Sequence, residues 1–228
     1  MFPIKDDQPR YSTPYINTFL IVLNILIFFF QSTLGPRAGE HFVRIYGEVP
    51  SHLAAFLAGS SPYTLPDIVI PFFTSMFLHA GWMHVLGNMW FLYIFGDNVE
   101  DYLGHFKYLI FYLLCGLIAM ATQVAINPES NIPTVGASGA IAGVLGAYFL
   151  LYPRARVLTW IFIVVLYLPA WIVLGEWIVL QVWATFSMSP VRDRGGIAFW
   201  AHIGGFVAGM VLIKVFPERA QRSPYAYR

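Results

Sequence analysis

The chain has 228 residues, of which 58% are hydrophobic and 18% aromatic, while only 11% are charged and the formal net charge is +1. A soluble domain carries about 25% charged residues, and this chain instead alternates runs of roughly 20 apolar residues with short charged connections. The composition therefore excludes a soluble globular protein. Because the charge is nearly neutral and the basic residues lie in loops, we expect no nucleic-acid partner.

Apolar length and helix breakers predict six helices, which make an all-α, polytopic membrane bundle. The expected ranges are 15–34, 82–102, 106–126, 137–152, 168–188 and 197–216. Pro128, Pro153 and Pro217 closely follow three of these ends, and proline cannot continue a helix. Pro169 divides the long apolar stretch before the fifth helix, so residues 157–167 are expected at the membrane surface.

The six-helix membrane domain is assigned to residues 14–216, between cytoplasmic tails at 1–13 and 217–228. The first apolar run lacks a small-residue cleavage site and is interpreted as a retained helix. Residues 35–75 mix charged and apolar side chains, which indicates a large, partly interfacial loop. Cys115 lies inside an apolar run and is interpreted as a small core residue.

Orientation follows from the basic residues, because the cytoplasmic side of a membrane protein carries more of them. With six spans, one side holds both termini and carries Lys5, Arg10, Lys107, Arg154, Arg156, Lys214, Arg219, Arg222 and Arg228. The other side carries Arg37, Arg44, Arg192 and Arg194. We therefore expect both termini in the cytoplasm of a cell (inner) membrane, with the loops near 127–134 and 189–196 outside.

Polar side chains inside spans are costly and are candidates for function. Three groups stand out: His84 with Asn88, Ser138 within Gly-Ala-Ser-Gly, and His202 within Ala-His-Ile-Gly-Gly. In the predicted topology His84, Ser138 and His202 lie within a few residues of the outer ends of their helices. They can therefore share one depth in the membrane.

Small residues recur every four positions on the fourth and sixth predicted helices. The stripes are Ser138, Ala142 and Gly146; Gly139, Gly143 and Ala147; and Ala201, Gly205 and Gly209. Such faces let helix backbones approach closely, so packing of these two helices is expected to bring Ser138 towards His202. An imidazole can then take the proton of the serine hydroxyl, which is a weak nucleophile by itself.

Ser138 also falls in the first turn of its helix, where unpaired N–H groups and the helix dipole stabilise an oxyanion. His84 and Asn88, four residues apart, face the same way and can donate further hydrogen bonds. Taken singly, a Gly-x-Ser-Gly sequence is more often a packing motif than a catalytic one, and a lone asparagine more often joins helices. A lone intramembrane histidine bridges helices as often as it acts in catalysis. The combination at one depth favours catalysis.

With these motifs in order, the sequence resembles the rhomboid family of intramembrane serine proteases over residues 71–209. The resemblance rests on HAGWMHVLGN (79–88), VEDYLG (99–104), GASGAIAGVLGAY (136–148) and AHIGGFVAG (201–209). It implies a six-helix rhomboid-like fold and a dyad in which Ser138 is the nucleophile and His202 the general base, with no cofactor and no metal.

The same resemblance implies roles for further residues. His84 and Asn88 correspond to oxyanion donors beside Gly136, and His79 to a structural histidine near the outer surface. Structural roles are also expected for Glu100, Gly139, Gly143, Gly205 and Gly209. The implied partners are transmembrane protein substrates within the lipid bilayer, cut near the outer face, and residues 168–196 resemble the family's lateral gate and cap.

Several residues depart from the family's pattern. Ala142 stands where some members carry an aromatic residue that packs on the catalytic histidine, and Ile70-Pro71 replaces a Trp-Arg pair. Tyr102 replaces an arginine two residues after Glu100, which is therefore expected to pair elsewhere, with Arg154 or Arg156. Glu176, in the middle of the fifth helix, is expected to bond a neighbour such as the helix face of Gln181, or to act in gating.

Three other functions remain open from the residues. A membrane metalloprotein would use His79, His84, His105 or His202, but the HExxH motif is absent and His105 falls on the opposite side of the membrane. A transporter would show internal repeats or helices broken at mid-membrane. An inactive rhomboid relative that binds membrane clients usually lacks the serine or the histidine, and this chain keeps both.

Overall fold

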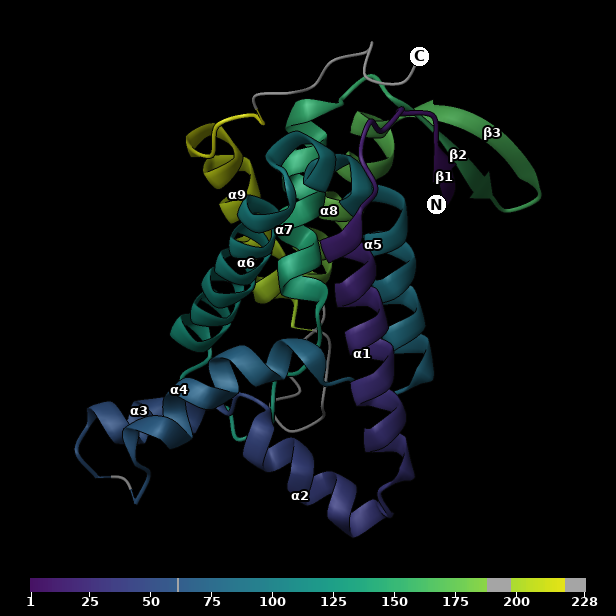
Figure 1. Ribbon diagram of the computed structural model, residues 1–228. Coiled ribbons are helices and arrows are strands. Elements are labelled where there is room, and N and C mark those ends of the chain that lie inside the picture. The colour runs from purple at the N-terminus through teal and green to yellow at the C-terminus, as the bar shows by residue number, and fades with distance from the viewer. Residues whose placement is uncertain (61, 188–197, 220–228) are drawn as a thin grey trace.

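The computed structural model describes residues 1–60, 62–187 and 198–219, and most of them are helical (Figure 1). The helices are α1 Tyr15–Thr33, α2 Pro36–Tyr46, α3 Pro50–Leu57, α4 Leu65–Thr74, the 3-10 helix η1 Ser75–Phe77, α5 Trp82–Leu103, α6 His105–Ile126, α7 Ser138–Leu151, α8 Ala170–Ser187 and α9 Phe199–Val215. The strands are β1 Phe2–Asp6, β2 Arg156–Ile161 and β3 Val164–Pro169. The predicted loop at 189–196 and residues 220–228 of the predicted C-terminal tail lie outside the described residues.

Six helices, α1 and α5 to α9, begin and end within two residues of the ranges predicted from apolar length. By length and composition, α1, α6 and α8 can each cross a membrane, and α4, η1 and α5, which are bent by 76°, pass the same test when they are taken together as one broken span. The apolar helices α7 and α9 are shorter, with 14 and 17 residues. The structure is that of a helical membrane protein.

Helix α7 is the centre of the bundle, and every residue from Gly139 to Tyr148 is buried. It is surrounded by α5, α6, α8 and α9 (Figure 1). A Cβ added at Gly205 would overlap the carbonyl of Gly139, and one at Gly209 would overlap Gly143. These glycines therefore bring α7 and α9 together with their backbones in contact.

The expectation of an all-α fold is wrong for the segment before α8. Strands β1, β2 and β3 form an antiparallel sheet in that order, with Phe2 opposite Trp160 and Ile161 opposite Val164. The sheet lies at one end of the bundle beside α5 (Figure 1). In β2, Val157 and Thr159 are buried while Trp160 is exposed, which is the two-residue period of a strand.

The predicted interfacial loop at 35–75 contains helices α2, α3 and α4, which lie at the opposite end of the bundle from the sheet (Figure 1). Thr64 caps α4, and the Asp67 carboxylate accepts a hydrogen bond from the Thr64 backbone N–H at 2.8 Å, which completes a capping box. Glu48 and Thr134 exchange backbone hydrogen bonds of 3.2 and 2.7 Å. This bridge joins the loop to the segment that leads into α7.

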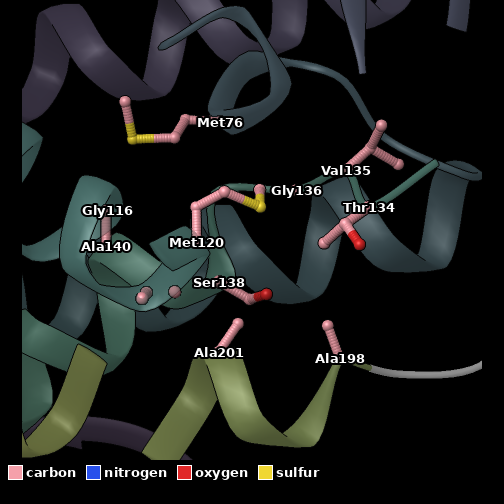
Figure 2. A pocket seen from close by; sticks show the side chains of 12 residues that line it. Met76, Gly116, Met120, Thr134, Val135, Gly136, Ser138, Ala140, Ala198 and Ala201 are labelled. Atoms are coloured by element: carbon pink, nitrogen blue, oxygen red, sulfur yellow. The ribbon is translucent and has the colours of Figure 1, made fainter. Parts of the chain in front are cut away.

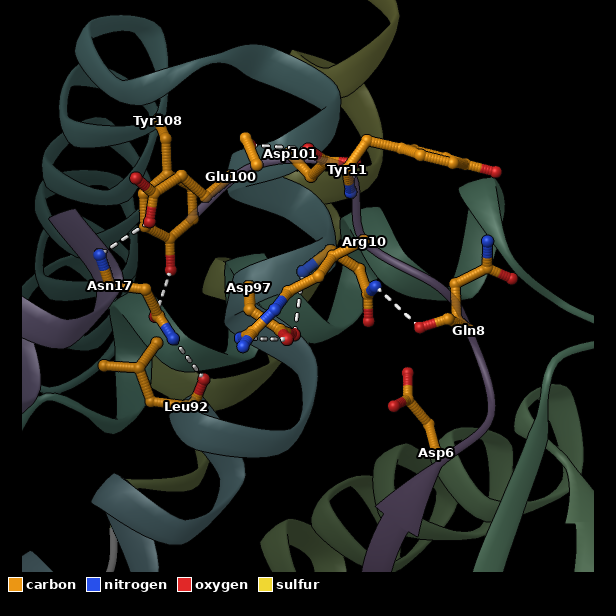
Figure 3. Close-up of polar contacts among 12 residues, drawn as sticks. Asp6, Gln8, Arg10, Tyr11, Asn17, Leu92, Asp97, Glu100, Asp101 and Tyr108 are labelled. Atoms are coloured by element: carbon orange, nitrogen blue, oxygen red, sulfur yellow. Dashed lines mark hydrogen bonds and ion pairs between the residues drawn. The ribbon is translucent and has the colours of Figure 1, made fainter. Parts of the chain in front are cut away.

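Glu100 connects α5 to the start of α1 (Figure 3). Its carboxylate accepts hydrogen bonds from the backbone N–H groups of Ile16 and Asn17, at 3.0 and 2.7 Å, and from His105 Nδ1. The expected pairing of Glu100 with Arg154 or Arg156 is wrong, because its acceptor oxygens are taken up by the first turn of α1. The carboxylate supplies the cap that Pro14, at the N-cap position, does not provide.

Candidate active site

Ser138 is the first residue of α7, and the backbone just before it has a special conformation. Gly136 has φ of +129°, which favours glycine, and its N–H donates to the Ser75 carbonyl at 2.9 Å. A Cβ at Gly136 would lie 2.8 Å from the ring atoms Cε1 and Nε2 of His84. The turn that presents Ser138 therefore packs directly against the His84 imidazole.

His202 lies in the first turn of α9 and is 8% exposed. Its Nε2 is 2.8 Å from Ser138 Oγ, which is hydrogen-bonding distance. The two residues come from different helices and are 64 positions apart in the chain. The backbone contact between α7 and α9 holds them at this distance.

The other ring nitrogen of His202 bonds a residue of α8. His202 Nδ1 is 2.7 Å from Gln181 Oε1. Trp177, one turn earlier on α8, has its ring centroid 5.7 Å from that of His202 at an interplanar angle of 38°. Phe199 adds an edge contact at 6.4 Å. These groups surround the imidazole where Ala142, which is buried, offers no ring.

His79, His84 and Asn88 form a second polar group beside the turn at Gly136. Asn88 Nδ2 is 3.0 Å from His79 Nε2, and the rings of His79 and His84 are 5.1 Å apart. Gln31 of α1 holds the backbone of His79, donating to its carbonyl at 2.7 Å and accepting from its N–H at 3.2 Å. His79 is fully buried.

A small pocket opens beside the serine (Figure 2). Its volume is about 20 Å³, and about 10 to 15 Å³ is enough for one water molecule. Met76, Met120, Val135 and Ala198 line it together with Gly136 and Ser138. In Figure 2 the Ser138 hydroxyl lies between α7 and the start of α9, near Ala198 and Ala201.

Two of the residues singled out in the sequence lie away from this site. Glu100 sits near the sheet end of the bundle, where it caps α1. Glu176 of α8 bonds neither the dyad nor Gln181, since its Oε1 accepts from the Met1 ammonium group at 3.1 Å. The contact of Gln181 with His202 was not predicted from the sequence, although an amide inside an apolar helix is the same kind of signal that singled out Asn88.

Comparisons with known proteins give a consistent result. A family model described as the Rhomboid domain matches residues 66–219. The chain is 31% identical over 150 residues to rhomboid-like protein 11, chloroplastic, of Arabidopsis thaliana, a match that covers 62% of this chain and 50% of that protein. It is 28% identical over 198 residues to rhomboid protease GluP of Bacillus subtilis, covering 86% of this chain and 34% of that protein.

A third relative is rhomboid protein 1, mitochondrial, of Saccharomyces cerevisiae, which is 27% identical over 142 residues, covering 60% of this chain and 39% of that protein. The chain spans half or less of the length of these three relatives. The fold and the matches define a polytopic helical membrane protein. More narrowly, the chain belongs to the rhomboid family.

Proposed function

We propose that this protein is an intramembrane serine endopeptidase that cuts transmembrane segments of other proteins. The observation that carries the proposal is the 2.8 Å hydrogen bond between Ser138 Oγ and His202 Nε2, in the interior of an apolar bundle. The family and the relative named as a protease support the same reaction class.

In the proposed reaction, Ser138 Oγ attacks the carbonyl carbon of the scissile peptide while His202 Nε2 takes the hydroxyl proton. The imidazolium then gives this proton to the leaving amine as the C–N bond breaks. The remaining ester between Ser138 and the substrate is hydrolysed by a water molecule, with His202 again acting as the base. No cofactor takes part in either half of the reaction.

The oxyanion of each tetrahedral intermediate would be stabilised by hydrogen-bond donors around Gly136 and the start of α7. The N–H groups in the first turn of α7 have no preceding helical turn to bond. Asn88 uses one amide hydrogen on His79, and an amide nitrogen carries two, so the second is available for the oxyanion. His84 lies against the same turn. His79 and Gln31 would keep Asn88 in position.

The length of α7 suggests where the reaction occurs. Its 14 residues extend over about 21 Å, which is less than the roughly 30 Å of hydrocarbon in a bilayer. If Leu151 is at the cytoplasmic surface, Ser138 lies below the outer surface, at a depth that a substrate helix can reach sideways. The pocket beside Ser138 would admit the hydrolytic water.

We also propose the topology that the sequence indicates. The six apolar helices would form one bundle that crosses a cell membrane, with both termini in the cytoplasm and the serine nearer the outer face. The more basic side of the chain supports this orientation. This topology can be tested with a cysteine introduced at Arg37 or at Arg154 and a thiol reagent that does not cross membranes. In intact cells, only the cysteine at Arg37 should react with the reagent.

The test of function compares the native chain with Ser138→Ala and His202→Ala, each purified and placed in liposomes with a single-span substrate. We expect cleavage by the native chain only, with both variants retaining the thermal stability of the native fold. The site of the cut is read by mass spectrometry. Cleavage by Ser138→Ala would refute the assignment of the nucleophile.

The alternative of a client-binding relative without proteolytic activity makes a different prediction. In that case the native chain would leave several single-span proteins uncut and would not react with a fluorophosphonate, which labels activated serines. It would nevertheless co-purify with a membrane protein client. The hydrogen bond between the Ser138 and His202 side chains favours the protease.

A further inference from the structure

Both ring nitrogens of His202 have hydrogen-bonding partners on neighbouring helices. Nδ1 faces Gln181 Oε1 at 2.7 Å while Nε2 faces Ser138 Oγ at 2.8 Å. A neutral imidazole has one N–H donor and one lone pair, and the partner of one nitrogen decides the state of the other. An amide oxygen only accepts hydrogen bonds, so it selects the form with the proton on Nδ1.

That form is the one that the proposed chemistry requires. With the proton on Nδ1, the lone pair on Nε2 points at the Ser138 hydroxyl and can take its proton. With the proton on Nε2, the imidazole would donate to Ser138 Oγ and could not act as a base. The amide of Gln181 thus occupies the place that a carboxylate has in a three-membered serine protease site.

Neighbouring residues of α8 contact the Gln181 backbone and the His202 ring. The Gln181 backbone carbonyl accepts a hydrogen bond from Thr185 Oγ1 at 2.8 Å, and Trp177 lies one turn earlier against the His202 ring. Both Trp177 and Gln181 therefore contact His202 from the same face of α8. Phe199 closes another side of the ring.

We propose that Gln181 is a positioning residue, which fixes the tautomer and orientation of His202 and so makes the base competent. This inference rests on the proposed protease function and deepens it. It answers what orients the imidazole in a chain that has Ala142 four residues after the serine. Gln181 does not touch the substrate in this role, so its effect should appear in the chemical step.

Two substitutions at Gln181 distinguish the effect of its hydrogen-bond acceptor from the effect of its side-chain shape. Gln181→Met keeps the length and removes the oxygen, and we expect kcat to fall by about 10 to 100-fold with KM within about two-fold. Fluorophosphonate labelling of Ser138 should slow by a similar factor, because it needs the base but no transmembrane substrate. Val179→Ala, on an exposed part of the same helix, serves as the matched control and should react as the native chain does.

The Gln181→Glu variant distinguishes a positioning role from a merely structural one, because only a positioning role predicts a shift of the pH profile. A carboxylate accepts from Nδ1–H and stabilises the imidazolium, so activity should be retained within about five-fold while the acidic limb of the kcat/KM profile moves up by about one pH unit. His84 is another titratable side chain whose charge acts on His202, and it is unchanged in all these variants.

These experiments distinguish failure of the proposed role of Gln181 from failure of the proposed protease function. If native protein and Ser138→Ala cleave or label alike, the proposed function fails. If native protein cleaves, Ser138→Ala does not, and Gln181→Met keeps the native kcat and labelling rate, only the role of Gln181 is overturned. Loss of activity in a folded Gln181→Glu variant to the level of Gln181→Met would also overturn it, because an acceptor at this position would then not suffice.

Discussion

Gly143 of α7 and Gly209 of α9 touch through their backbones, and a side chain at Gly209 would overlap Gly143. We expect Gly209→Leu to push the two helices apart and to lower the free energy of unfolding by about 1 to 3 kcal/mol. Cleavage should fall further than stability, since Ser138 and His202 belong to the separated helices. Unfolding in mixed micelles and a cleavage assay measure the two effects, with Val211→Ala on the exposed side of α9 as the control.

Glu100 should matter for stability more than for catalysis. In Glu100→Gln one oxygen becomes an NH₂ group, which cannot accept from the N–H groups of Ile16 and Asn17. We expect a loss of about 1 to 3 kcal/mol in the free energy of unfolding, because a buried donor at the start of α1 loses its partner. The exposed Glu40→Gln is the control. Equal stability of both variants would show that the cap contributes little.

Glu48 makes stability depend on pH. Burial raises the pKa of its carboxyl from 4.5 to about 8, and Oε1 has no hydrogen-bond partner among the described residues. Since the folded state binds the proton more tightly, stability is fully present below about pH 4.5 and falls up to about pH 8, by at most about 1.4 kcal/mol per pH unit. Glu48→Gln should remove this decline, as thermal unfolding from pH 5 to 9 will measure. A variant with the native pH dependence would contradict the assignment.

Gly136 should be needed for activity, both because of its positive φ and because the His84 ring lies against it. Alanine is strained at φ of +129°, and its Cβ would press on the His84 ring. We expect Gly136→Ala to lower kcat by about 100-fold, through displacement of Ser138 and of the oxyanion donors. Gly35→Ala is the matched control, because that glycine has a negative φ and open space around it. A fully active Gly136→Ala variant would show that the conformation of this turn is not needed for catalysis.

Apolar runs and the breakers that follow them were sufficient to predict the six apolar helices, because an apolar run that ends near a proline or glycine has few other folds available in a membrane. The short helices of residues 35–75 and the sheet were not predicted. Strand β2 alternates buried and exposed side chains over only six residues, and its partner β1 lies more than 140 positions away. A single sequence contains no signal for such a distant pairing.

The candidate site was also predictable only in part from the sequence. Ser138, His202, His84 and Asn88 were singled out as polar groups at one depth, and the structure places these four residues around one turn of chain. The contact from Gln181 depends on how α8 is rotated about its own axis, which the nearly uniform apolar surface of that helix does not specify. The acceptor role of Glu100 depends on where α1 begins relative to α5, and again no local pattern contains that information.

Strand β1 has a consequence for the order of assembly. Residues 2–6 are synthesised well before β2, their hydrogen-bonding partner, which begins only at Arg156. At a synthesis rate of about 5 to 20 residues per second, roughly 8 to 30 seconds separate the two segments. During that time α1, α5, α6 and α7 can leave the ribosome while the edge of β1 remains unpaired. The sheet can therefore close only late in biogenesis, after the central helix α7 has been synthesised.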